Sequence, residues 1–136
     1  MKSLFVYITV FIVVLSCNNH NKSSSTMEAI QDSLIVSTPK HYNLGVLKKD
    51  VSDSIYTFKF EITNMKTDSI HINNVDVSCG CLFINSFPRK IAPGETNKLV
   101  GTINISQQRG HLSKAIFVNY DEDGLLILRI IGDIKS

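Results

Sequence analysis

Hydrophobic and polar residues alternate along most of the chain between residues 55 and 134. The clearest alternation lies in residues 55–62, where one face of an extended chain carries four apolar side chains: Tyr56, Phe58, Phe60 and Ile62. The residues between them, mostly polar, face the other way, because successive side chains of a strand point to opposite faces. This segment is therefore predicted to be a half-buried β-strand.

Further segments of the same kind follow, and polar turns separate them. The predicted strands are 70–77 with a bend or bulge at Asn73-Asn74, then 82–87, 99–105, 115–120 and 125–134. In the 99–105 strand one side carries Leu99, Gly101, Ile103 and Ile105. Turns are expected at 64–68, at Pro88, at Ala92-Pro93-Gly94-Glu95, at 107–110 and at Asp121-Glu122-Asp123-Gly124.

No segment keeps the period of an amphipathic helix. Short strands, with a turn about every ten residues over roughly one hundred residues, are typical of an immunoglobulin-like sandwich. The pattern predicts an all-β, antiparallel β-sandwich of about seven strands over residues 34–136.

The first residues carry a different pattern. Lys2 precedes an apolar run from Leu4 to Leu15, which is shorter than the ~20 apolar residues that a membrane-spanning helix needs. A short positive region before such a run is typical of a signal peptide, here residues 1–16. Residues 17–33 are rich in Asn, Ser and Lys, and this composition predicts a flexible tether.

The signal-like run ends in Val14-Leu15-Ser16-Cys17, which resembles the lipobox of bacterial lipoproteins. The resemblance implies cleavage before Cys17 and lipidation of that cysteine, and hence a bacterial cell-envelope protein held to the membrane by its lipid anchor. A plain secretory signal or an uncleaved anchor helix, with Cys17 incidental, are the alternatives. Each of these readings places the domain outside the cytoplasm.

Charge limits the classes of partner. The formal net charge is +2 and no Lys/Arg cluster interleaves with aromatic residues, so nucleic acid is not an expected partner. No catalytic motif appears either. Ser106 and Ser113 lack a nucleophile-elbow pattern, and residues 121–124 lack the ligand spacing of a calcium loop. The chain is not expected to be an enzyme.

The remaining cysteines, Cys79 and Cys81, flank Gly80. In an extended chain their side chains point the same way with Cα atoms ~6.6 Å apart, near the upper limit for a disulfide. We expect Gly80, which has no Cβ, to permit a kink or a close backbone approach. An exported compartment favours oxidation. A structural disulfide and a pair of buried thiols both fit.

Two sharper interpretations of the pair stay open. Two thiolates hold a soft ion such as copper in its Cu(I) state, with His41, His71 and His111 as possible further ligands, although none has a fixed ligand spacing from the pair. A redox role, exchanging electrons with a periplasmic partner, is the other. It lacks the Cys-x-x-Cys at a helix start that activates a thiol.

Several separated motifs resemble one known family. They are Asn64, the run Val77-Ser78-Cys79-Gly80-Cys81, the turn Ile91-Ala92-Pro93-Gly94-Glu95, Gly110 and the terminal Ile131-Gly132-Asp133-Ile134. Together they resemble the bacterial family called domain of unknown function 1573, from His41 to Ile134. Met65, Lys66 and Leu82 depart from its usual residues.

The resemblance implies a fold similar to the ASH and major sperm protein group. It also implies an exported, often lipid-anchored domain of a kind common in Bacteroidetes and Planctomycetes. Its motif positions are Asn64, Gly80, Pro93, Gly94 and Gly132. The family brings no established activity, so function must come from the residues themselves.

The resulting functional hypothesis is a non-catalytic binding or scaffolding domain with an envelope protein as partner. The alternative is a copper-binding or redox protein that uses Cys79 and Cys81. Sandwiches often bind by adding a strand to an exposed edge. The segment 82–87, with Leu82, Ile84 and Phe87, is the expected edge; alternatively these side chains fill the core.

Overall fold

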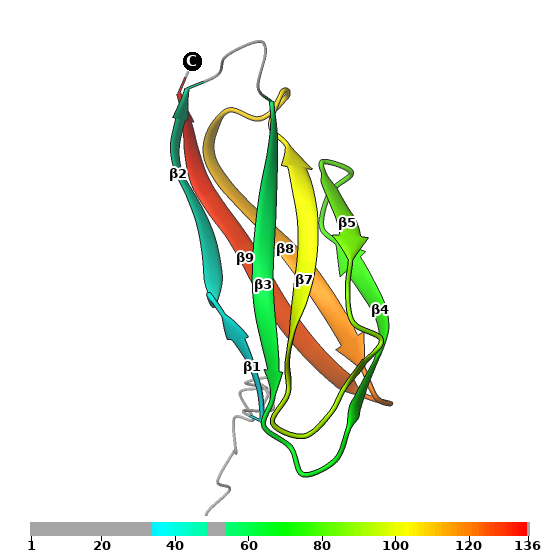
Figure 1. The fold of residues 1–136 in the computed structure, drawn as a ribbon. Helices are drawn as coiled ribbons and strands as arrows, with labels where there is room; N and C mark the ends of the chain where they lie inside the picture. The colour runs from blue at the N-terminus through cyan, green and yellow to red at the C-terminus, as the bar shows by residue number, and fades with distance from the viewer. Residues whose placement is uncertain (1–33, 49–53, 136) are drawn as a thin grey trace, which may run out of the picture.

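The computed structural model describes residues 34–48 and 54–135, which form nine β-strands (Figure 1). They are β1 Ile35–Thr38, β2 His41–Lys48, β3 Ile55–Asn64, β4 Ile70–Val77, β5 Leu82–Ser86, β6 Lys90–Ile91, β7 Thr96–Asn104, β8 Gly110–Tyr120 and β9 Gly124–Lys135. Within these ranges no helix is long and apolar enough to cross a membrane. The expected signal peptide, Cys17 and the tether lie outside the described residues.

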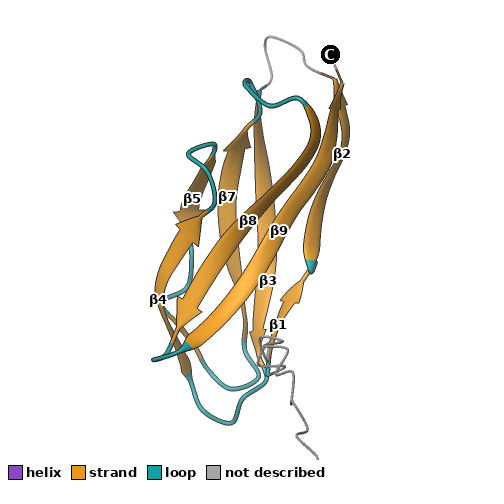
Figure 2. Ribbon diagram, turned by 180° about the vertical axis from the view of Figure 1, so that it is seen from behind, coloured by secondary structure: helices purple, strands orange, loops and turns teal. Residues whose placement is uncertain are grey.

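The strands form two sheets that face each other (Figures 1 and 2). The four-stranded sheet has the order β1-β3-β7-β5, and the five-stranded sheet has the order β2-β9-β8-β4-β6. Strands β1 and β2 are therefore the edges on one side of the sandwich. Strands β5 and β6 are the edges on the other side.

One pair of strands is parallel, which corrects the expectation of an entirely antiparallel sandwich. β1 pairs with β3 in the four-stranded sheet, and after Pro39 the chain continues as β2 in the five-stranded sheet, parallel to β9. Neither β1 nor β2 was predicted. The signal in β2 is weak because Gly45, at φ +72°, interrupts it where the register shifts between Asn43 and Val46.

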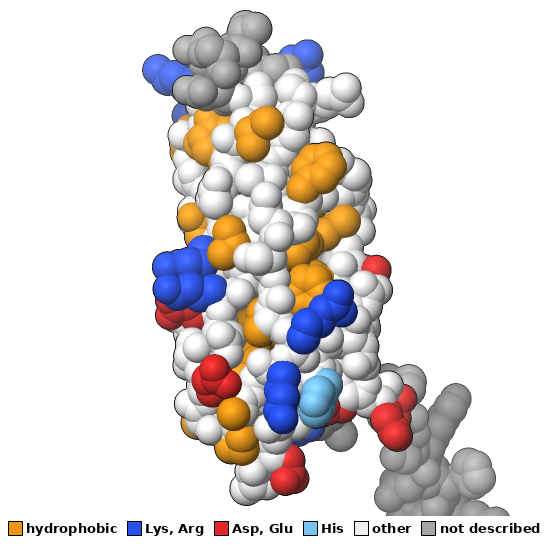
Figure 3. All heavy atoms as spheres, turned by 45° about the vertical axis from the view of Figure 1, so that its right-hand side comes forward, with side chains coloured by type: hydrophobic (Ala, Val, Ile, Leu, Met, Phe, Trp, Pro, Cys, Tyr) orange, Lys and Arg blue, Asp and Glu red, His pale blue; other side chains and the backbone are white. Residues whose placement is uncertain are grey.

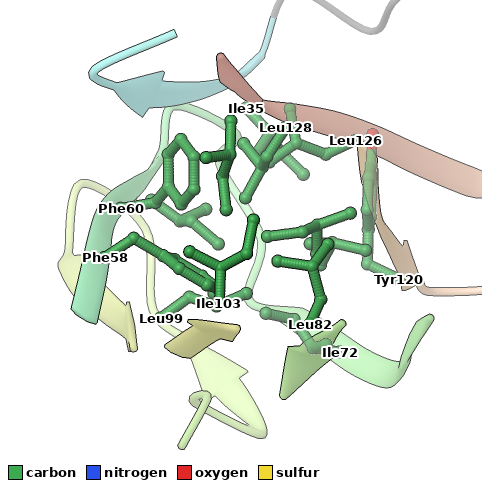
Figure 4. Packing of buried hydrophobic residues seen from close by; sticks show 14 of the residues in the cluster. Ile35, Phe58, Phe60, Ile72, Leu82, Leu99, Ile103, Tyr120, Leu126 and Leu128 are labelled. Carbon is green, nitrogen blue, oxygen red and sulfur yellow. The ribbon is translucent and has the colours of Figure 1, made fainter. Parts of the chain in front are cut away.

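The inner faces of β3 and β7 supply much of the core, as their alternation predicts. Phe58, Phe60 and Ile62 are fully buried, and so are Leu99 and Ile103, which lie beside them on the neighbouring strand β7. Figure 4 shows four of these side chains packed in the core with Leu126 and Leu128 of the opposite sheet: Phe58, Phe60, Leu99 and Ile103. Aromatic rings add edge-to-face contacts, with centroids 6.0 Å apart between Phe58 and Phe60 and 5.9 Å apart between Phe60 and Tyr42.

Strand boundaries differ from the prediction where polar residues are paired. β7 begins at Thr96 rather than at residue 99, and β8 begins at Gly110 rather than at residue 115. The added residues of β7 pair with β3, and those of β8 pair with β9. This pairing uses backbone groups and does not require hydrophobic side chains. The expected irregularity at Asn73 is confirmed by the register shift between Ile72 and Asn74.

Candidate functional site

Cys79 and Cys81 lie in the connection that crosses from β4 in one sheet to β5 in the other. Their sulfur atoms are bonded at 1.96 Å, their Cα atoms are 5.2 Å apart, and both residues are half-buried. The prediction that both cysteines lie in the extended end of a strand is wrong. Residues 78–81 leave the strand, and the Leu82 N–H donates a hydrogen bond to the Cys79 carbonyl at 3.2 Å, which closes a β-turn.

The expected kink at Gly80 is present, because the chain turns there and the Cα atoms of the two cysteines are 5.2 Å apart, but the kink does not depend on glycine. A Cβ added there would meet no atom within 4 Å, and its φ is outside the left-handed region. Neither a close approach nor a special backbone conformation therefore requires glycine. The turn hydrogen bond and the disulfide bring the two cysteines together.

Hydrogen bonds fasten both flanks of this turn to the sandwich. On the first flank, the Ser78 N–H donates to the Ala115 carbonyl at 3.0 Å, and the Ala115 N–H donates to Ser78 Oγ at 2.9 Å. On the second flank, the Asn104 N–H donates to the Cys81 carbonyl at 2.8 Å. The turn is thus attached to β8 and to β7 independently of its disulfide.

An open hollow of about 420 Å³ lies beside the disulfide. Residues 79–81 and Phe83 line it, together with amide and hydroxyl side chains from the end of β7 and the turn after it: Asn104, Ser106, Gln107 and Gln108. That second turn is held by a hydrogen bond from the Gln108 N–H to the Ile105 carbonyl at 2.9 Å. No lining residue is charged.

Strand β5 is the edge of the four-stranded sheet, next to this hollow. Leu82 is 3% exposed and fills the core, as the alternative to a binding surface predicted. Ile84 and Phe87 are half-buried and pack against the core. The side chain that does face outward is Phe83, at 57% exposure. Sequence reasoning missed Phe83, although its alternation with Leu82 and Ile84 was a usable signal.

The surface on this side of the molecule is unevenly charged. Figure 3 shows hydrophobic patches down this side, with most of its charged side chains in the lower half.

A second hollow, of about 500 Å³, follows the far end of β5 and is lined by Ser86, Phe87, Pro88, Thr96, Asn97 and Lys98. Arg89 covers the Phe87 ring, with its guanidinium carbon 4.7 Å from the ring centroid. Strand β5 therefore has a hollow at each end.

The histidines named as possible ligands are all exposed and lie on three different strands. His41 begins β2, His71 lies in β4, and His111 in β8 pairs its Nδ1 with Asp133 Oδ1 at 3.1 Å. Within residues 34–48 and 54–135, no three His, Cys, Asp or Glu residues are grouped to hold a metal ion.

Asp121 of the acidic run lies in the hairpin between β8 and β9. Its Oδ1 accepts a hydrogen bond from the His71 N–H at 3.0 Å. The expected hairpin turn is confirmed, and this aspartate ties it to β4.

Asn64, the motif asparagine, is fully buried at the end of β3. Its Nδ2 donates to the Asp68 carbonyl at 2.8 Å and to the Ile91 carbonyl at 3.0 Å, and its Oδ1 accepts from the Lys66 N–H at 2.9 Å. Its backbone carbonyl also accepts from the Gly94 N–H at 2.8 Å. One amide therefore joins two turns that are distant in sequence.

The other motif positions support turns and close contacts. Gly94 has a φ of +71°, which favours glycine. The Glu95 carboxylate accepts hydrogen bonds from the Ala92 N–H and from Asn97 Nδ2, and these bonds lower the pKa of Glu95. Gly132 lets β2 approach, since an added Cβ would lie 3.2 Å from the Gly45 carbonyl oxygen. These residues maintain the fold.

Comparison with solved structures shows the same fold at low sequence identity. A protein of unknown function from Porphyromonas gingivalis W83 is 12% identical with a TM-score of 0.60, over 74% of this chain and 46% of that one. The VesB protease of Vibrio cholerae is 14% identical with a TM-score of 0.60, over 75% and 32%. The ASH/PapD-like domain 7 of human CEP192 is 10% identical with a TM-score of 0.55, over 76% and 86%.

The chain spans less than half the length of the first two proteins, so the likeness concerns the fold alone. The prediction of an immunoglobulin-like sandwich, with a fold similar to that of ASH and major sperm protein domains, is confirmed. No curated protein is detectably similar in sequence.

The motif residues Asn64, Gly80, Pro93, Gly94 and Gly132 all fall within one matched region. The model of the family described as "Protein of unknown function (DUF1573)" matches residues 36–134. That region takes in all nine strands apart from one residue at each end. The chain therefore belongs to the DUF1573 family.

Proposed function

We propose that this protein is a lipid-anchored, non-catalytic β-sandwich that binds another cell-envelope protein by strand addition at β5. The observation that carries the proposal is the position of β5 as an uncharged edge strand, Leu-Phe-Ile-Asn-Ser, of the four-stranded sheet. Edge strands are usually protected by charge, proline or a bulge, because unpaired backbone groups invite another strand. β5 carries no charge and no proline, and its register against β7 shifts only near its end, between Ile84 and Ser86.

The backbone of β5 has polar groups directed away from its neighbour. Cys81 is hydrogen-bonded to Asn104 at the start of the β5–β7 ladder. In an antiparallel ladder such pairs alternate with residues whose N–H and C=O groups face outward. Phe83 is the next residue whose backbone N–H and C=O point toward β7, although its side chain is exposed. The backbone N–H and C=O of Ile84 therefore point away from β7, toward a potential partner strand.

The other three edges are less suited to pairing with a partner. β6 consists of only Lys90 and Ile91, and β2 is interrupted at Gly45. β1 has four residues and ends just before Pro39. Strand β5 also has a hollow at each end and the exposed Phe83 ring, which supply places for side chains of an added strand.

The anchor supplies the cellular setting of the proposal. The lipobox-like Val14-Leu15-Ser16-Cys17 and the polar residues 18–33 lie outside the described residues. A flexible tether of this length would keep the sandwich on the order of 20 Å from the membrane surface. A partner would then be an envelope protein within that reach.

Site-specific photo-crosslinking in intact cells tests the proposal. A photoreactive amino acid replaces Asn85, an exposed residue of β5, and in the control it replaces Val36, an exposed residue of the opposite edge strand β1. We expect a discrete crosslinked protein from position 85 and none from position 36. Equal products from both positions, or none from position 85, would contradict binding at β5.

The copper alternative gains no specific support from the described residues. While Cys79 and Cys81 are bonded to each other, neither provides a thiolate for a metal ion. The redox alternative is different, because the disulfide itself is the reactant.

A further inference from the structure

We propose that the Cys79–Cys81 disulfide is an exchange site that accepts two electrons from a dithiol carried on an extended protein segment. The inference goes beyond the binding role at β5. Its test measures the oxidation state of two sulfur atoms, so it succeeds or fails independently of the crosslinking result.

The disulfide contributes little to the stability of the fold. It joins residues two apart in sequence, and a loop this short restricts the unfolded chain much less than a long one. Both flanks of its turn already have hydrogen bonds, to Ala115 in β8 and to Asn104 in β7. Opening the bond therefore separates no strands and leaves the turn attached.

The disulfide is also accessible to a reactant. Cys79 and Cys81 are half-buried and both line the 420 Å³ hollow, which is open to solvent. A structural disulfide of a sandwich typically connects its two sheets through the core. Here the bond lies at the rim instead, beside the edge strand β5.

The lining of the hollow indicates the class of reactant. The side-chain amides of Asn104, Gln107 and Gln108 both donate and accept hydrogen bonds, as a peptide backbone does. Phe83 adds an exposed aromatic surface, and no lining residue offers a charge to a charged small thiol such as glutathione. An uncharged peptide segment carrying two thiols fits these features.

The exchange balances in two displacements. One thiolate of the partner bonds to the sulfur of one cysteine, the Cys79–Cys81 bond breaks, and the other cysteine leaves as a thiolate and takes up a proton. The partner's second thiolate then displaces the first cysteine, which is also protonated. The partner becomes a disulfide, and Cys79 and Cys81 become thiols.

The test uses the full chain with the substitution Cys17→Ser, so that only two cysteines remain. The protein is incubated without denaturant with dithiothreitol, or with an uncharged peptide rich in Val and Thr that carries two cysteines. Alkylation and mass spectrometry then count the free thiols over time. We expect complete reduction, a native circular dichroism spectrum, and a rate with the peptide about tenfold above that of dithiothreitol at equal thiolate concentration.

A matched variant separates exchange from a structural role. The full chain with Cys17→Ser, Cys79→Ser and Cys81→Ser should keep the urea midpoint of the oxidised protein. A disulfide that is reduced only after urea unfolds the chain, or a domain that unfolds on reduction, would overturn the proposal. Equal rates with the peptide and with dithiothreitol would overturn the assignment of a peptide segment as the reactant.

Discussion

At the scale of the residue, one buried side chain, that of Asn64, connects two parts of the family motif, the end of β3 and the turn at residues 91–95. It joins the turn after β3 to Ile91, and the adjoining backbone contacts Gly94 and Glu95. The sequence marked Asn64 only by resemblance, because an asparagine at a predicted strand end looks like an ordinary turn residue. Its partners, Asp68 and Ile91, lie on separate segments that only the folded chain brings together.

We expect Asn64→Ala to destabilise the protein by about 2–4 kcal/mol, since it removes three hydrogen bonds of a buried amide, to the Asp68 and Ile91 carbonyls and from the Lys66 N–H. The free energy of unfolding in urea measures this cost. Asn85→Ala is the control, because Asn85 is exposed on β5 and its loss should change stability by less than about 0.5 kcal/mol. Similar small effects of both substitutions would show that the Asn64 amide does not hold the turns together.

Strand β7 illustrates what is decided at the scale of the element. Its alternation predicted correctly that Gly101 shares the inner side with Leu99 and Ile103. The reason for a glycine there appears only in the sandwich. A Cβ at Gly101 would overlap the Phe58 ring from β3 and the Phe83 carbonyl oxygen from β5. Gly101 thus lets both neighbouring strands approach.

Alanine substitutions at Gly101 and Gly80 should have different effects on stability, because an added Cβ clashes at the first position and meets no atom at the second. Gly101→Ala should cost about 1–3 kcal/mol, because the added methyl group forces the Phe58 ring or β5 to move. Gly80→Ala should be neutral or stabilise by about 0.4–1 kcal/mol, because its Cβ meets nothing and the unfolded chain loses freedom. Urea unfolding of both variants measures the difference, and the opposite order would refute this account of β5 and β7.

At the scale of the whole molecule, the proposed anchor and the proposed binding edge belong to opposite sides of the sandwich. β5 and the disulfide lie on one side, while β1, the first strand after the proposed tether, is an edge on the opposite side. A chain leaving the membrane at β1 would therefore not cover β5. This arrangement is consistent with a domain that is anchored at one edge and binds at the other.

We expect Cys17→Ser to release the protein from membranes or to block its processing, since the proposed lipid anchor requires that sulfur. Membrane partition after carbonate washing measures the effect. The variant with Cys79→Ser and Cys81→Ser keeps Cys17 and should stay in the membrane fraction. Continued membrane association of Cys17→Ser after the wash would contradict lipid anchoring.

The sequence by itself determined the class of fold, the inner faces of β3 and β7 and the hairpin at Asp121, because each depends on residues close together along the chain. Hydrophobic alternation and turn residues are local properties. Only the tertiary structure decided that β2 runs parallel to β9, that Cys79 and Cys81 lie in a turn, and that Phe83 faces outward on an edge strand. Strand neighbours depend on pairing between distant segments, which the packing of both sheets selects together.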